Sequence, residues 1–508
     1  MSLTYHFDTW NVDADAADLV LLWQGTKLHG IGFLESWGYT QDDWLLTLFP
    51  ITAAICETIG PFPFSILGLG WVIFAANIVL TAALTWRLSP TAGLLIIPAL
   101  LLMGHDALGW AGFLSYPISH NGSVVWGFVA VLAAAYWIRH GAIAALLVSA
   151  AAQIADVLSD PWSAVAFALP ILFASLGVAI LQSRLRLRLA LCSAVSLLAL
   201  LCLWTQAFGY LSFLPPADFE FTDSNGLVTN LAWLSRSLQT IWSPFPGVDQ
   251  PDPLAGLLVI SMMSACIVCT WKTAGKWLQR MHPDQHFIIL AGTLSCLLPV
   301  IAFLSGNFLL ALSIGRFVVP LSILAPAFLL VGLCRSWALL SVWSRLLVAA
   351  FIAMMIVSGV ASRPEAWERF RIGPKADGVT AIVKFLAAHS LTYGYGPYWG
   401  IEANAVSWIS RDAYRIRPVN FTPNGGIVRR YGQTSPSWYQ RGDAPAGTRR
   451  FFVAVVGDGE NCPEPDRCVR GVESEFGKAD ETLVLDDPGL RFGPITFLVW
   501  HRPPPDAL

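Results

Sequence analysis

Long apolar runs separated by short polar connections occupy the middle of the chain. Ten of them are close to the length of about 17–25 helical residues that spans a bilayer core: 64–86, 91–118, 123–138, 142–158, 162–182, 189–209, 254–271, 286–306, 317–334 and 345–361. The second run is interrupted by His105 and Asp106, so we expect a helix that ends near residue 104, followed by a surface segment. The pattern predicts a polytopic α-helical membrane protein with about ten transmembrane helices.

Basic residues mark every second connection between these runs. The connections after the first, third, fifth, seventh and ninth runs carry Arg87, Arg139, Arg184, Arg186, Arg188, Lys272, Lys276, Arg280, Arg335 and Arg345. Cytoplasmic loops of membrane proteins are enriched in Lys and Arg. We therefore expect residues 64–361 to form the transmembrane domain, with the acidic segment 1–63, its interfacial helices, the 210–253 loop and the tail outside the cytoplasm.

The composition agrees with a membrane protein. Hydrophobic residues make up 55% of the 508 residues and charged residues only 13%, and the mean hydropathy is +0.58. Soluble proteins carry about 25% charged residues, and a soluble fold has no place for so much apolar surface. The net charge of −3 argues against a nucleic-acid partner, because such partners favour a basic face.

The segment 362–508 has a different pattern. Residues 375–389 have apolar positions at helical spacing, and a second helix is expected over 399–409. Short runs typical of β-strands occupy 391–395, 415–421, 451–456, 482–485 and 495–500. We predict a small extracytoplasmic α/β domain. Because it has neither a Gly-rich phosphate loop nor a nucleophile elbow, we expect it to be accessory.

The nine cysteines fall into two groups. Seven lie in apolar runs, where we interpret them as small hydrophobic residues. Cys462 and Cys468 instead bracket a polar loop. If that loop lies outside the cytoplasm, a local disulfide is expected.

The densest group of ionisable residues lies near the amino terminus. Asp13, Asp15 and Asp18 have spacings that let three carboxylates point the same way at the start of a helix. Crowded carboxylates raise one another's pKa or bind a divalent cation, and either property suits acid–base chemistry. The same residues are also typical of an N-cap and a solvated first turn. For a second pair, Asp42 and Asp43, helix capping is the favoured interpretation.

Four short motifs resemble the GT-C superfamily of membrane glycosyltransferases, which includes bacterial aminoarabinose transferases and protein O-mannosyltransferases. The motifs are Asp13-Ala-Asp15 in the first external loop, the turn Ser115-Tyr-Pro-Ile-Ser-His120-Asn121, Gly315-Arg316-Phe317-Val-Val-Pro320, and Leu391-Thr-Tyr-Gly-Tyr395-Gly-Pro-Tyr398-Trp399. The resemblance implies a GT-C-like helical domain in a bacterial inner membrane.

The resemblance also implies a reaction and roles for particular residues. Family members transfer a sugar from a polyprenyl-phosphate donor to a lipid, glycan or protein acceptor at the external face, with inversion of the anomeric centre. Asp13 is expected to be the general base, and Asp15 its partner or, with Asp13, a ligand of a divalent cation such as Mg²⁺ or Mn²⁺. Arg316 is expected to hold the donor phosphate. The other expected substrate-binding residues are His120, Asn121, Asp42, Asp43 and Tyr395.

Two departures from the family pattern leave alternatives open. The 115–121 turn has no carboxylate, so His120 is either a replacement ligand or a surface residue, and metal dependence stays open. Only 12 residues precede Asp13, so we expect that the start codon is assigned too late and that a first transmembrane helix is missing. The alternative functions are a polysaccharide polymerase or ligase, a noncatalytic member of the fold, and a transporter-type protein of envelope glycan assembly.

Overall fold

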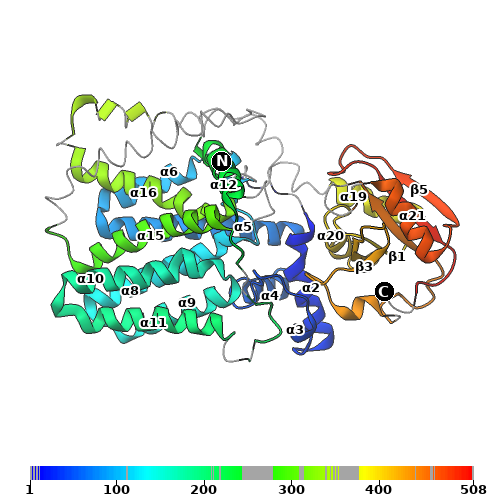
Figure 1. Cartoon of the computed structure of the whole chain (residues 1–508), viewed down its shortest axis with the longest axis horizontal. Helices are drawn as coiled ribbons and strands as arrows, with labels where there is room; N and C mark the ends of the chain where they lie inside the picture. Colours follow the sequence, from blue (N-terminus) through cyan, green and yellow to red (C-terminus); the bar gives the residue numbers. More distant parts are fainter. Residues whose placement is uncertain are drawn as a thin grey trace.

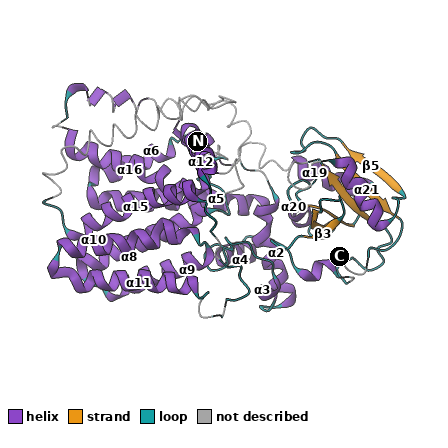
Figure 2. Ribbon diagram, viewed as in Figure 1, coloured by secondary structure: helices purple, strands orange, loops and turns teal. Residues whose placement is uncertain are grey.

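The structure is a computed structural model. It describes residues 12–103, 105–109, 112–206, 209, 211–216, 219–242, 279–307, 314–337, 340–343, 345–346, 349–350, 353, 377–440, 442–457, 462 and 464–505, together with Leu3, His6 and Trp10. Figure 1 shows a helical bundle and a separate C-terminal domain, with helix α2 (Ala14–His29) at the junction between them. The described strands all lie in the C-terminal domain (Figure 2).

Six helices in the described part of the chain are long and apolar enough to cross a membrane. They are α5 (Pro63–Leu88), α8 (His120–His140), η1 with α10 (Ala164–Ala168, Leu169–Leu181), η2 with α11 (Ser183–Leu185, Arg186–Trp204), α15 (Pro283–Ser305) and η3 with α16 (Ile314–Val318, Val319–Ser336). Two shorter apolar helices, α6 (Pro90–Leu101) and α9 (Ile143–Ser159), belong to the same bundle. These lengths and compositions are those of a membrane protein.

Eight of the ten predicted runs coincide with these helices. The run at 91–118 becomes α6, which ends at Leu101, and a segment with the short helix α7 (His105–Leu108) follows it. Residues 112–117 were expected at the surface, but they are buried, because the amino-terminal residues cover them. The run 254–271 lies outside the described residues, and 345–361 lies almost wholly outside them. A total of ten spans therefore stays a prediction.

The basic connections meet at one end of the bundle. Arg188 donates to the carbonyl oxygen of Arg139 at 3.2 Å, and the Arg139 guanidinium lies 3.5 Å from the Asp284 carboxylate. Arg335 donates from Nε to the carbonyl oxygen of Leu88 at 3.0 Å. These contacts join the carboxyl end of α8 to the amino ends of α11 and α15, and the carboxyl end of α16 to that of α5. Helix α2 and the C-terminal domain lie at the opposite end.

Polar side chains link three helices inside the bundle. Ser196 on α11 donates to Gln153 Oε1 at 2.8 Å, and Gln153 Nε2 donates to Ser149 Oγ at 3.1 Å. Ser149 in turn donates to the carbonyl oxygen of Ala130 on α8 at 3.0 Å. Such hydrogen bonds hold apolar helices together where lipid provides no hydrophobic driving force between them.

The region 210–253, expected as a long loop, contains helix α12 (Ser224–Trp242). Asn230 on this helix donates to the carbonyl oxygens of Phe303, Leu304 and Gly306 at 3.1, 3.2 and 2.8 Å. The last carbonyls of a helix have no partner within it. The side chain of Asn230 therefore caps the carboxyl end of α15 and fixes α12 against the bundle.

The C-terminal domain is a six-stranded sheet with helices α19 (Asp377–Ala388), α20 (Ala403–Ile409) and α21 (Pro465–Phe476). The strand order is β3-β2-β1-β4-β6-β5, with β1 at Tyr393–Pro397, β2 at Arg415–Phe421, β3 at Ile427–Arg429, β4 at Phe451–Val456, β5 at Glu481–Leu485 and β6 at Ile495–Trp500. β1 pairs in parallel with β2 and β4, and the other pairs are antiparallel. Five strands and two helices coincide with predicted segments.

The sequence did not predict β3 and α21. β3 has three residues, too few to show alternation. The residues between Cys462 and Cys468, expected as a polar loop, lead into α21, which has Pro465 at a position that favours a helix start. Cys462 and Cys468 form the expected disulfide.

A backbone contact joins the segment after α2 to the C-terminal domain. This segment contains α3 (Phe33–Ser36) and precedes α4 (Phe49–Thr58). Gly38 N donates to the carbonyl oxygen of Thr434 at 2.7 Å, and Gln433 N donates to that of Gly38 at 2.5 Å. A Cβ atom at Gly38 would lie 1.7 Å from the carbonyl oxygen of Tyr431, so no larger residue fits without a shift of the backbone.

Gly38→Ala is expected to loosen this junction, because the added methyl group overlaps the Tyr431 backbone. We expect a loss of about 1–3 kcal/mol in the free energy of unfolding, the usual range for overpacking. Thermal unfolding of the solubilised protein measures it. Gly32→Ala is the matched control, since no atom lies within 4 Å of its added Cβ. Equal melting temperatures for the two variants would contradict the close contact.

Candidate functional site

Helix α2 begins at Asp13, whose side chain has two partners. Asp13 Oδ1 accepts from Ala16 N at 2.9 Å, which is the expected N-cap contact. The hydroxyl of Tyr116 lies 2.8 and 2.9 Å from the two carboxylate oxygens of Asp13. Tyr116 is held by the ring of Trp10, with centroids 4.4 Å apart, and by Asn121, which donates to its carbonyl oxygen at 2.8 Å. Asp13 therefore caps the helix, and it also accepts a hydrogen bond from the hydroxyl of Tyr116.

Tyr398 of the C-terminal domain lies between the other two aspartates of α2. Its hydroxyl oxygen is 2.9 Å from Asp15 Oδ1 and 3.0 Å from each oxygen of Asp18. Gln433 donates to Asp15 at 3.1 Å, and Asn404 donates to Asp18 at 2.8 Å. A phenol has one proton to donate, so only one carboxylate can accept it at a time. The second contact is favourable when the other aspartate carries a proton, and burial raises the pKa of both Asp15 and Asp18 in that direction.

Glu402 caps the same helix from the C-terminal domain. Its Oε2 accepts from Ala14 N at 2.7 Å, one of the first-turn amides that have no partner within the helix. Glu402 has a φ of 50°, in the left-handed region that favours glycine. A non-glycine residue costs on the order of 1–3 kcal/mol there. The contact with α2 offsets part of that cost.

Two arginines bring positive charge to the aspartates. The Arg430 guanidinium lies 4.1 Å from the Tyr398 ring centroid, and its Nη2 donates to Gln433 Oε1 at 3.1 Å. Arg316, the predicted phosphate anchor, lies near enough to Asp15 for its charge to lower that group's pKa. Arg316 Nε is buried and has no hydrogen-bond partner among the described residues. An unpaired buried donor is costly, so an anionic ligand would stabilise it.

Burial governs the protonation of these carboxyl groups. Loss of hydration, and then the nearby charge of Asp15, raise the pKa of Asp13 to about 7. Burial also raises the pKa of Asp15 and, more strongly, that of Asp18 and of Glu402. A carboxyl group with a pKa near the working pH is well matched to general-base catalysis.

The residues around Asp13, Asp15 and Asp18 form a first polar cluster. A second polar cluster lies at the same end of the bundle. His120 Nδ1 is 2.7 Å from Asp160 Oδ2, and Ser123 Oγ donates to the same oxygen at 2.6 Å. The His120 ring packs against Phe317, with centroids 5.0 Å apart. Because Phe317 directly follows Arg316, the second cluster adjoins the first through this segment.

Asp43 lies at the edge of the second cluster. Its Oδ1 accepts from Leu45 N at 2.7 Å, a local contact of the capping type expected from the sequence. Its backbone N donates to the carbonyl oxygen of Ser159 at 3.0 Å. Burial, followed by the charges of Asp42 and Asp160, raises the pKa of Asp43 to about 8.

The remaining predicted residues have other surroundings. Asn121 is fully buried and holds the backbone of the turn that carries Tyr116. Asp42 is half-buried beside Asp43. Tyr395 is buried in the core of the sheet. The tyrosine that contacts the aspartates is Tyr398, three positions further along.

The sequence did not point to two tyrosines and one hydrogen-bonded His–Asp pair. Tyr116 and Tyr398 stand within the motifs of the resemblance, but nothing in those motifs marks them. Asp160 also has a helix-capping contact, since it accepts from Trp162 N at 3.1 Å. Its pairing with His120 also provides the carboxylate that the 115–121 turn lacks. The sequence gives no sign of this pairing, because 40 positions separate the partners.

The C-terminal domain is part of the first cluster rather than accessory to it. It contributes Tyr398, Glu402, Asn404, Arg430 and Gln433. Three of them follow the carboxyl end of β1, and the other two follow β3. The domain was expected to be accessory because it lacks a Gly-rich phosphate loop and a nucleophile elbow. The absence of these motifs does not exclude side chains that contact helix α2.

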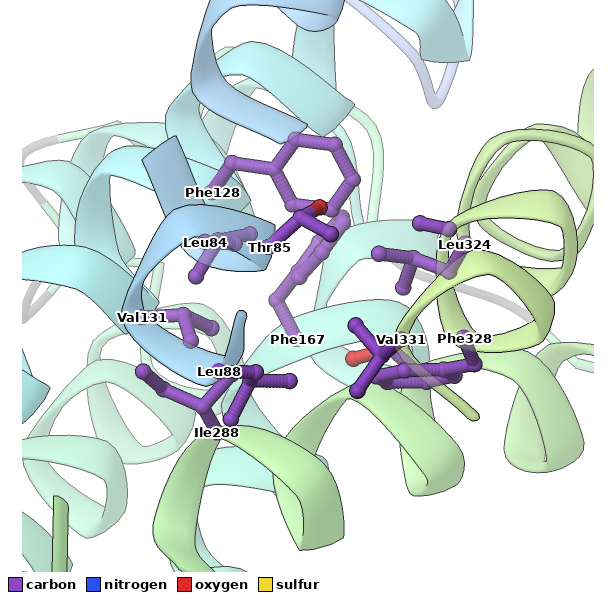
Figure 3. Close-up of a pocket in the computed structure, with 13 residues that line it drawn as sticks. Leu84, Thr85, Leu88, Phe128, Val131, Phe167, Ile288, Leu324, Phe328 and Val331 are labelled. Atoms are coloured by element: carbon purple, nitrogen blue, oxygen red, sulfur yellow. The ribbon is translucent and has the colours of Figure 1, made fainter. Parts of the chain in front are cut away.

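An apolar pocket lies inside the bundle, toward the basic end. It is lined by side chains from α5, α8, η1, α15 and α16, among them Leu88, Phe128, Phe167, Ile288 and Val331 (Figure 3). Figure 3 shows these side chains converging on a space with few polar groups. The pocket does not belong to either polar cluster.

Among the residues that the structure describes, no three His, Cys, Asp or Glu side chains are arranged to hold a metal ion. In the first cluster, tyrosine, asparagine and glutamine donors occupy the carboxylate oxygens instead. The divalent cation at Asp13 and Asp15 stays a prediction.

No protein-family model matches the chain, and no curated protein matches it either. We therefore infer the function from the geometry and charge of the two clusters.

Asp43 predicts a pH-dependent stability. Its pKa is about 8 in the folded protein against an ordinary value of 3.8, so between about pH 4 and pH 8 the folded state binds more protons than the unfolded state. Stability must then decrease as pH rises through this window. We expect the melting temperature to fall from about pH 5 to pH 8, and to fall less in Asp43→Asn.

The matched control for this measurement is Asp486→Asn, which alters an exposed aspartate of the C-terminal domain. Its melting temperature should follow the wild-type slope. A slope that is the same in Asp43→Asn and in wild type would show that Asp43 is ionised across the range.

Proposed function

We propose that the protein is an inverting membrane glycosyltransferase that moves a sugar from a polyprenyl-phosphate donor to a lipid, glycan or protein acceptor. The observation that carries the proposal is the proximity of Asp15 to Arg430 and Arg316, at the end of the bundle opposite the basic connections. Basic connections favour the cytoplasmic side. Their position supports an external location for the aspartates.

Sugar transfer needs a base and a cation at the same place. The base removes the proton of the acceptor hydroxyl as its oxygen bonds to the anomeric carbon, and the bond from that carbon to the phosphate oxygen breaks with its electron pair. A positioned carboxylate contributes about 10²–10⁴-fold to such a step. Fixed positive charge stabilises the leaving phosphate. The aspartates of α2, with Arg316 and Arg430, offer both.

Asp15 is better situated than Asp13 to meet an acceptor. Asp13 is 4% exposed, and its oxygens are engaged by Tyr116 and Ala16 N. Asp15 is half-buried and is the member of the pair near Arg316. We therefore assign proton removal to Asp15, with Asp13 as the neighbour that tunes its charge. The sequence alone favoured the reverse assignment.

The C-terminal domain has a defined part in this proposal. Tyr398 and Gln433 hold Asp15 in place, and Arg430 adds a second positive charge nearby. A base fixed by buried partners loses little free energy to reorganisation during the reaction. The domain thus completes the site that α2 begins.

Asp15→Asn should lower sugar transfer by about 10²–10⁴-fold, because the amide cannot remove the acceptor proton. Transfer is measured in proteoliposomes with a panel of polyprenyl-phosphate sugars and membrane-extract acceptors. Asp13→Asn should lose less, since asparagine caps a helix about as well as aspartate. Asp486→Asn is the control with the same chemical change at an exposed position outside the cluster. Wild-type transfer by Asp15→Asn would remove the assigned base.

Arg316→Gln is expected to raise the KM for the donor by about tenfold or more, because hydrogen bonds to charged groups are worth about 1.5–3 kcal/mol. Arg316→Lys keeps the charge but loses the two-nitrogen fork, so its KM should be intermediate. Arg184→Gln, an exposed position at the basic end, is the control. An unchanged KM in Arg316→Gln would mean that the donor phosphate binds elsewhere.

A further inference from the structure

A groove of about 350 Å³ lies between the second half of α2 and the C-terminal domain. Leu21 and Phe33 line one side, and Asp412, Arg415 and Trp438 line the other. Ligand pockets in proteins are commonly about 300–1,000 Å³. The groove is therefore of a size to take one small ligand, and it shares no lining residue with the aspartate cluster.

Two buried polar atoms along the groove have no hydrogen-bond partner in the described part of the chain. They are Asp412 Oδ1 and Arg415 Nε. The neighbouring charges are satisfied, since Arg417 donates to both oxygens of Asp443 at 2.5 and 2.7 Å. Buried polar groups in native proteins almost always have a partner. One acceptor and one donor are thus left for a group that enters the groove.

The backbone that presents Asp412 is unusual. Arg411 and Asp412 have φ values of 51° and 60°, in the left-handed region. They follow α20, and Asp412 N donates to the carbonyl oxygen of Ser407 at 2.8 Å, a helix ending at which glycine is common. Glycine would adopt this conformation at little cost. Side chains held in such conformations gather at ligand sites.

The two unpaired atoms indicate the chemistry of the ligand. The Nη1 atom of Arg415 donates to the carbonyl oxygen of Asp443, whereas Nε has no partner in the described part of the chain. The unpaired acceptor, Asp412 Oδ1, belongs to a carboxylate, which would repel a second carboxylate. A hydroxyl group accepts one hydrogen bond and donates another, and it therefore suits Arg415 Nε and Asp412 Oδ1 together.

The rest of the groove agrees with a polyhydroxylated ligand. The charged side chains that line it, Asp412, Arg415, Arg417 and Asp443, are balanced in sign. Ser437 and Gln440 add neutral hydrogen-bonding groups at its exposed rim. Leu21, Phe33 and Trp438 give apolar surface of the kind that packs against the carbon–hydrogen face of a sugar ring.

We propose that this groove is a binding site for a neutral sugar residue, separate from the aspartate cluster. A ring hydroxyl bridges Asp412 and Arg415, and the apolar side chains pack against the ring. The proposal does not depend on the transferase activity, since none of its residues takes part in the proposed chemistry.

The test uses the full-length protein in lipid nanodiscs, free of sugar-headed detergent. Saturation-transfer NMR and calorimetric titration are run with maltose, N,N′-diacetylchitobiose and methyl glucoside, and with glutamate and glucuronic acid as charged probes. We expect saturable binding of at least one neutral sugar. Asp412→Gly and Arg415→Lys should each weaken it by about tenfold or more, since each leaves a hydroxyl contact unmade. Arg411→Gln, at the exposed neighbour of Asp412, should leave the affinity unchanged.

Asp412→Gly separates a ligand contact from a structural role. Glycine relieves the left-handed backbone, so the variant should melt at the same temperature as wild type or higher while it loses sugar affinity. Asp13→Asn, which alters the aspartate cluster, should bind the sugar like wild type. A failure of sugar binding can therefore be distinguished from a failure of the transferase proposal. Absence of saturable neutral-sugar binding, equal affinity in Asp412→Gly, or binding of glutamate alone would each overturn the proposal.

Discussion

The hydroxyl of Tyr398 ties the C-terminal domain to helix α2 through Asp15 and Asp18, and the other features of the site depend on this contact. Burial of the aspartates at this junction raises the pKa values of Asp13, Asp15 and Asp18. A single phenol proton cannot satisfy two carboxylates at once, so the contact favours the protonated form of one of the two aspartates. The interaction thus couples the docking of the domain to the protonation of the group assigned to catalysis.

The helical bundle has two chemically different ends. One end gathers arginines that bond to helix carbonyls and to Asp284. The other carries α2, the His120–Asp160 pair and the segment of Arg316 and Phe317. Polar groups at the ends of apolar helices reach water, whereas the same groups in mid-membrane are costly. Under the proposed function, this end of the bundle is the membrane boundary at which a lipid-linked donor and its acceptor meet.

The sequence predicted the features that depend on residues close together in the chain. Run lengths predicted the described apolar helices, and short runs typical of β-strands predicted β2, β4 and β6 at the bounds found. The aspartates of α2 were visible as a cluster because they are close in sequence. The partners of these aspartates could not be predicted, since 383 positions separate Asp15 from Tyr398. Only the start of helix α21 was taken for a loop, because the residues between Cys462 and Cys468 are polar; the apolar positions Cys468, Val472 and Phe476 do have helical spacing.

We propose that α2 and the C-terminal domain lie on the external side of the membrane and that the basic end lies on the cytoplasmic side. Cysteines introduced by Gly32→Cys, Gly442→Cys and Arg184→Cys at exposed positions can be labelled with a membrane-impermeant maleimide on intact cells. We expect reaction at residues 32 and 442 without permeabilisation, and at residue 184 only after it. Reaction of residue 184 in intact cells, or residues 32 and 442 on opposite sides, would contradict this orientation.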